Sequence, residues 1–174
     1  TDEHQPPVVK LFSTKYQLEA RAARLTYDGE HRQVRMTDPN SVTVLRARRP
    51  ILKCPDVSLT LGDDSQLQSA LCRGAGWLVH RDVESQSIQF AADWKSQLEF
   101  GADPTTGLDH LVLQDTASFR QPAEEMALGA ELIRVWIKPS SENGPSSSQP
   151  SEFASLGRGM EIERLKAERD VRVV

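Results

Sequence analysis

One apolar pattern recurs three times along the chain and constrains its fold more than any single residue. The first two copies are Leu108, Leu111, Leu113, Ala117 and Phe119, and then, 54 residues further on, Ile162, Leu165, Ala167, Val171 and Val173. The third copy, with the same spacing, is Leu67, Ala70, Cys72, Gly76 and Leu78. Apolar and other positions alternate in each half, with a three-residue break between the halves. This pattern predicts two short strands joined by a bend, and such units must stack to bury their apolar faces.

The remainder of the chain shows the same alternation between strong turn signals. Leu25 and Tyr27 precede the turn pair Asp28-Gly29, and further alternating runs follow over residues 34–44, 57–61 and 133–137. Residues 18–25 and 161–170 have helix-forming composition, but the alternation and the repeat match favour strands. We therefore predict the all-β class, an antiparallel, repeat-built structure of about a dozen short strands.

Composition divides the chain into one domain and two less ordered segments. Residues 1–17 form a polar lead-in and possible edge strand, and residues 18–174 form a single domain. Residues 139–159 are rich in Ser, Pro and Gly, which predicts a disordered surface insertion inside the domain. The start at Thr1 without Met suggests a mature or excised fragment.

Charge and motif content argue against several classes of function. The net charge is -4, with 21 basic and 25 acidic residues dispersed along the chain, so nucleic acid is not an expected partner. The basic cluster Arg46, Arg48, Arg49 and Lys53 is read as a solvated strand end. No apolar run is long enough for a transmembrane segment. The four His and two Cys are not spaced as metal ligands, so we expect no bound metal. The sequence has no GxSxG elbow and no phosphate-binding loop, so we expect no cofactor and no enzymatic activity.

Two residue groups have both a structural and a functional interpretation. Asp63, Asp64 and Asp103 lie in turn contexts, where Asx hydrogen bonds explain them more simply than catalysis does. The three tryptophans can form a ligand platform or pack in the core or at its rim, and packing is the more common role.

A family resemblance rests on the order of apolar positions around a turn. The starts Ala22, Leu25, Tyr27 and Ala130, Ile133, Val135, together with the L-x-A-x-x-x-V-x-V run over 165–173, resemble the OstA-like repeat of periplasmic lipopolysaccharide-transport proteins of the LptA and LptC type. The resemblance covers roughly residues 18–174. It implies a twisted β-jellyroll, or open β-taco solenoid, whose apolar groove carries lipid A acyl chains and whose ends join edge to edge.

From this resemblance we expect a lipid-handling protein of the periplasm or cell envelope, binding lipopolysaccharide or another acyl lipid and pairing head to tail with itself or related proteins. A structural β-solenoid adaptor that docks partners through its strand edges, without a lipid, is the alternative. Whether the interior is an open groove or a filled core is left open. The residues expected to face the interior and form the groove are Leu25, Tyr27, Val34, Met36, Val42, Val44, Leu59, Leu61, Leu111, Leu113, Phe119, Ile133, Val135, Leu165, Val171 and Val173.

Overall fold

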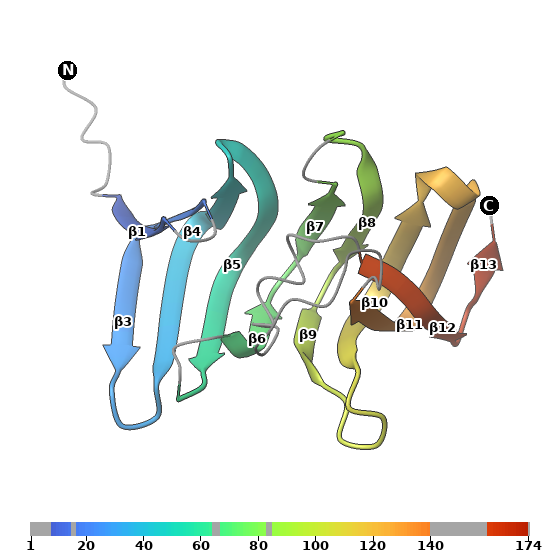
Figure 1. Cartoon of the computed structure of the whole chain (residues 1–174). Helices are drawn as coiled ribbons and strands as arrows, with labels where there is room; N and C mark the ends of the chain where they lie inside the picture. The colour runs from blue at the N-terminus through green and yellow to red at the C-terminus, as the bar shows by residue number, and fades with distance from the viewer. Residues whose placement is uncertain (1–7, 15–16, 64–66, 83–84, 140–159, 174) are drawn as a thin grey trace, which may run out of the picture.

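The computed structural model describes residues 8–14, 17–63, 67–82, 85–139 and 160–173 (Figure 1). Within them the only helix is a three-residue 3-10 turn, Pro122–Glu124, and every other regular element is a strand. The strands are β1 Val9–Ser13, β2 Leu18–Ala22, β3 Arg24–Asp28, β4 Gln33–Arg46, β5 Arg49–Leu61, β6 Leu67–Arg73, β7 Gly76–Arg81, β8 Ile88–Trp94, β9 Gln97–Ala102, β10 Asp109–Gln121, β11 Met126–Pro139, β12 Met160–Glu168 and β13 Arg172–Val173. The strand prediction is confirmed for both segments with helix-forming composition.

The break predicted inside each repeat copy is a local reversal of the backbone. Asp115 and Thr116 have positive φ angles of 66° and 46°, and Arg169 and Asp170 have 63° and 45°. Positive φ is uncommon for residues other than glycine, so two consecutive ones mark a sharp bend. In the third copy Gly74, with φ 87°, takes this position. The bend is therefore present in all three copies. Two copies form the predicted two strands, β6 with β7 and β12 with β13, whereas the other copy forms the single bent strand β10.

The bends allow one strand to pair with different neighbours through its two halves. Residues 109–114 of β10 pair with β9, whereas residues 118–120 pair with β8. Residues 56–61 of β5 pair with β6, and Leu52 and Lys53 of the same strand pair with β7. All of these pairs are antiparallel. Each bent strand thus contributes to two layers that face one another.

These pairings close a ring, which corrects the fold predicted from the sequence. β5 pairs with β6, β6 with β9, β9 with β10, β10 with β8, β8 with β7, and β7 returns to β5. The result is a closed six-strand antiparallel barrel with seven peripheral strands. The all-β class holds, but the open β-jellyroll or β-taco solenoid is wrong. The repeat pattern predicts each unit, whereas closure depends on which strands the two halves of β5 and β10 meet.

Most of the residues expected in the interior are buried there. Eight are at most 8% exposed, namely Val34, Met36, Val42, Leu111, Leu113, Phe119, Ile133 and Val135. Five more are partly buried and pack against this core, namely Leu25, Val44, Leu59, Leu61 and Leu165. Alternation within the strands therefore identified the inward face over most of the chain.

Three residues of that set are exposed, so the prediction of burial is wrong for them. Tyr27, Val171 and Val173 are 60%, 49% and 80% exposed. Tyr27 pairs with buried Val34, and Val173 pairs with Leu128, so both lie on the inward face of their sheets. Both belong to edge strands, β3 and β13, which pair on one side only among the described strands. Val171 lies between β12 and β13, where the chain is not a strand.

The edges of the structure lie at its two ends (Figure 1). Among the described strands, β1 pairs only with β2 and β3 only with β4, while β12 and β13 pair only with β11. The N-terminal and C-terminal strands thus end the sheet on opposite sides of the barrel. The predicted edge strand within residues 1–17 is β1, and residues 140–159 of the predicted insertion lie outside the described residues.

Candidate apolar ligand cavity

A cavity of about 240 Å³ lies between the facing layers. Its lining is apolar except for Ser13 and the thiol of Cys72. The lining residues are Leu11, Ser13, Leu18, Ala20, Met36, Val44, Ile51, Leu52, Val57, Leu59, Leu61, Leu67, Ala70, Cys72, Leu78, Phe90, Leu98, Phe100, Leu111 and Ile137. They come from the barrel strands and also from β1, β2, β4 and β11. A cavity of this character excludes polar ligands and holds apolar ones.

The space exists because the inward side chains of the two layers do not fill it. Leu59, Ala70 and Phe100 occupy one cross-strand row, and all three remain partly accessible although they face inward. Leu11 in edge strand β1 lines the cavity and is 39% exposed, so the cavity reaches the surface beside this strand. By contrast, Leu113 and Ile133 in the neighbouring row are fully buried core.

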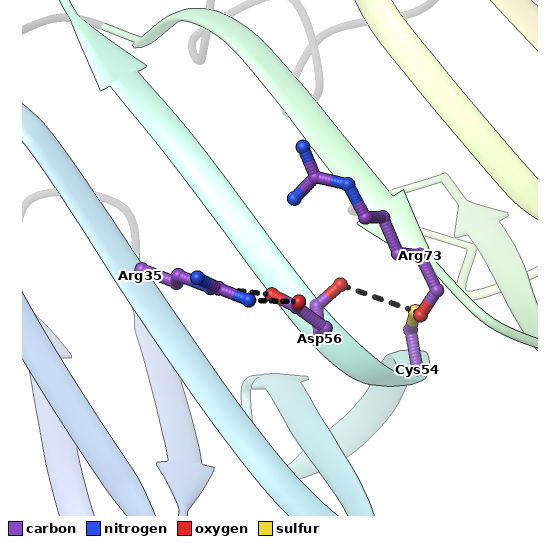
Figure 2. Close-up of polar contacts among 4 residues, drawn as sticks. All are labelled: Arg35, Cys54, Asp56 and Arg73. Carbon is purple, nitrogen blue, oxygen red and sulfur yellow. Dashed lines mark hydrogen bonds and ion pairs between the residues drawn. The ribbon is translucent and has the colours of Figure 1, made fainter.

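The bend of β5 fixes one side of the cavity through polar contacts. Figure 2 shows the guanidinium of Arg35 in β4 facing the carboxylate of Asp56, with Nη2 to Oδ2 at 2.7 Å and Nε to Oδ1 at 3.2 Å. The Cys54 thiol donates to the carbonyl of Arg73 at 3.1 Å. These contacts hold β4, β5 and the end of β6 together next to the lining residue Cys72. The Cys72 thiol donates a hydrogen bond to the sulfur of Cys54, and this bond, together with burial, raises the pKa of Cys72 well above its usual value, so Cys72 stays a neutral thiol.

The other end of this cavity wall carries the hairpin between β4 and β5. Its two turn residues, Ala47 and Arg48, have φ angles of 47° and 67°. The Ala47 N–H donates to the Gln17 carbonyl at 3.1 Å, which fixes the hairpin against the segment leading into β2. Arg46 pairs with Leu18 and with Arg49. Burial lowers the pKa of Arg46, but a guanidinium remains charged at any physiological pH.

His80 is the buried titratable group next to this hairpin. Its side chain is 6% exposed and stacks on Phe90, a lining residue, with 5.1 Å between ring centroids. Burial lowers the pKa of His80 to about 4, and the positive charge of Arg46 contributes in the same direction. Asp82 acts in the opposite direction with a smaller effect. His80 is therefore neutral at pH 7.

The sequence analysis found only part of this cavity. Of the sixteen residues expected to form a lipid groove, Met36, Val44, Leu59, Leu61 and Leu111 line it. The remaining eleven, including Leu25, Leu165, Tyr27, Val171 and Val173, are core, periphery or exposed edge and lie outside the lining. Alternation around Ala70, Leu98 and Phe100 was a signal that could have added them. No pattern marked Leu11 and Ser13, because β1 was read as part of a lead-in.

The other candidate residues have structural partners. The Asp103 carboxylate accepts from the Thr105 N–H at 2.7 Å and from Trp136 Nε1 at 2.5 Å, which confirms the Asx turn. The Trp136 ring is covered by His110, at 4.8 Å between centroids, and by Arg164, at 5.2 Å, so it packs at the core rim. Trp94 is buried and donates to the Gly74 carbonyl.

No group of three or more potential metal ligands occurs in the part of the chain that the structure describes. Within the same part, no helix has the length and apolar character needed to cross a bilayer. No protein-family model matches the chain, and no curated protein matches it.

Proposed function

We propose that the protein binds one acyl chain of an amphipathic lipid in its apolar cavity and handles lipids in the cell envelope. The observation that supports this most directly is the cavity itself, whose 240 Å³ is lined almost entirely by apolar side chains. The resemblance of the repeat to lipopolysaccharide-transport proteins points to the periplasm and to an acyl lipid as the ligand.

The volume of the cavity limits the ligand to one chain. An apolar cavity of roughly 150 Å³ already accommodates benzene, and pockets for drug-sized ligands run from about 300 to 1,000 Å³. The 240 Å³ here lies between the two. A lipid with several acyl chains would place one in the cavity and leave the others outside it.

The expected affinity follows from the same volume. The cavity corresponds to about eight water molecules at about 30 Å³ each, and a packed methylene group takes a similar space. Burying about eight methylene groups at about 0.8 kcal/mol each contributes about 6 kcal/mol. This corresponds to a dissociation constant on the order of 10–100 µM before polar contacts are added.

A cavity-filling substitution tests the proposal. Ala70 lines the cavity on β6, whereas Gln68 on the same strand is exposed and outside the lining. In a displacement assay with a fluorescent fatty acid, Ala70→Phe should lower the affinity by about tenfold or more, and Gln68→Phe should leave it unchanged. An Ala70→Phe protein with native melting temperature and native affinity would show that the ligand does not bind in this cavity.

The exposed edge strand favours a second candidate function, an adaptor that docks partners by strand addition. β1 pairs only with β2 among the described strands and exposes Val9, Leu11 and Phe12, the last at 62%. An unpaired apolar edge of this kind can pair with a strand of another chain, and a lysine on the edge strand disfavours such pairing. Head-to-tail pairing with a second copy should appear in analytical ultracentrifugation as weak, concentration-dependent association. Phe12→Lys should reduce it, and a protein that stays monomeric at all concentrations would leave this candidate without support.

A further inference from the structure

We infer that the head of the bound amphiphile is anionic and that it binds the arginine tip, defined as Arg46, Arg48 and Arg49 at the β4–β5 hairpin. This inference rests on the proposed function, since it concerns the polar end of the same ligand. It names the ligand class as a single-chain amphiphile with a carboxylate or phosphate head.

The strand register places the tip beside the cavity. Arg46 is the cross-strand partner of Leu18, and Leu18 is the partner of Ser13. Residues directly opposite on neighbouring strands project from the same face of a sheet. Since Leu18 and Ser13 both line the cavity, Arg46 lies on the cavity side of the sheet. Arg49 pairs with Arg46 and lies on that side too.

The effect of the Arg46 charge on His80 agrees with this placement by the strand register. The Arg46 charge acts on His80, and His80 stacks on the lining residue Phe90. Arg46 is half-buried, whereas Arg48 and Arg49 are exposed. The tip therefore combines one half-buried guanidinium group with two exposed ones.

The tip is assembled against two local preferences. Like charges directly opposite in a strand pair destabilise it, and Arg46 faces Arg49. A two-residue turn with positive φ at both positions favours Asn-Gly or Asp-Gly, whereas here the residues are Ala47-Arg48. Local rules broken together in this way are typical of functional sites.

The charged groups around the tip include acidic side chains. Asp82 acts on His80 in the opposite direction to Arg46, and the pKa of Glu19 is lowered mainly by its hydrogen bond with Arg21 and also by the charge of Arg48. Glu19 contacts Arg21 at 2.6 Å and Lys10 at 4.0 Å. Guanidinium groups bind carboxylate and phosphate oxygens in a bidentate fork, so the complement of this tip is an anionic head.

The test compares four amphiphiles with the same twelve-carbon chain by calorimetry on the full chain. Dodecanoate and dodecyl phosphate carry anionic heads, dodecanol a neutral one and dodecyltrimethylammonium a cationic one. We expect both anions to bind about tenfold or more tightly than dodecanol, with a preference that falls as salt rises, and the cation to bind more weakly than dodecanol. The ratio of dodecyl phosphate to dodecanoate affinity separates a phosphate head from a carboxylate one.

Arginine substitutions test whether the preference for anionic amphiphiles arises at the tip. The double variant Arg48→Gln/Arg49→Gln alters two exposed side chains and should bring the anions close to dodecanol, and Arg46→Gln should act in the same direction. Arg24→Gln on β3, an exposed arginine away from the tip, should leave the preference intact. Equal binding of all four amphiphiles would overturn the anionic head, and a preference unchanged in the double variant would overturn its binding at the tip. Either result would leave acyl-chain binding in place. If none of the four amphiphiles binds, both the anionic head and acyl-chain binding are overturned.

Discussion

The buried imidazole of His80 should make the stability of the protein depend on pH in a predictable range. Its pKa in the folded protein is about 4, against 6.5 for an unperturbed histidine. At 1.36 kcal/mol per pH unit, this difference corresponds to about 3 kcal/mol of stability. That is a substantial part of the 5–15 kcal/mol that a typical domain has in total.

The sign follows from which state binds the proton. Between pH 6.5 and pH 4 the unfolded chain is protonated at this histidine and the folded protein is not. The contribution of His80 is therefore fully present above about pH 6.5 and is lost as the pH falls toward 4. Protonation within the fold would place a cation in a buried site shielded from water and near the positive charge of Arg46, which is why it is resisted.

Chemical denaturation at pH 7.5, 6.0, 5.0 and 4.5 measures this effect. Wild type should lose about 2 kcal/mol or more of unfolding free energy over this range relative to His80→Gln, which cannot titrate. Carboxylates with lowered pKa values, such as Asp103 and Glu168, contribute equally to both proteins and cancel in the difference. His31→Gln, at an exposed position, is the matched control and should follow wild type. A difference between wild type and His80→Gln that stays constant with pH would refute the reasoning.

Two further predictions concern packing. A Cβ at Gly76 would lie 2.5 Å from the Lys53 carbonyl oxygen and 2.6 Å from Trp94 Cζ2. Gly76→Ala should therefore lower the free energy of unfolding, measured by urea denaturation, by about 1–3 kcal/mol or more. Gly129→Ala is the control and should lower it by less than half as much, because the nearest atom to a Cβ there is at 3.8 Å. Equal effects would show that the backbone at Gly76 relaxes freely. Leu113→Asp should unfold the domain by circular dichroism, because it buries an unpaired carboxylate at several kcal/mol. Tyr27→Asp, at an exposed edge position, should change stability by about 0.5 kcal/mol or less, and a large loss there would contradict the observed exposure.

The strands and their inward faces were predictable because they depend on local alternation. Leu111, Leu113 and Ile133 follow a period of two, and the structure buries all three. The bend at Asp115 and Thr116 was visible as a polar break at the same place in two copies. Alternation, however, identifies a face and not what covers it. Tyr27 and Val173 are on the correct face but are exposed, since both lie on strands that form edges among the described strands.

Closure of the barrel and the shape of its cavity were not predictable, because they depend on contacts between distant residues. Pairing of Leu52 with Leu78 closes the ring, and nothing local in either strand selects that partner. The cavity likewise depends on how far side chains such as Leu59 and Phe100 reach across the interior. The arginine tip was seen in the sequence only as a solvated strand end, since its proximity to Leu18 and Ser13 follows from the register of β2 with β4.

The barrel is closed by the fewest residue pairs at the seam between β5 and β7. Only two residue pairs, Leu52 with Leu78 and Lys53 with Trp77, join these strands, whereas β5 and β6 share six. Each backbone hydrogen bond contributes about 1 kcal/mol net, so parting this seam costs far less than unfolding the domain. With the seam parted, the ring becomes a continuous curved sheet whose other pairings are intact, and the wall beside Leu78 is free to widen. The amide protons that bond across these two residue pairs should therefore exchange ahead of those in β10 and β11.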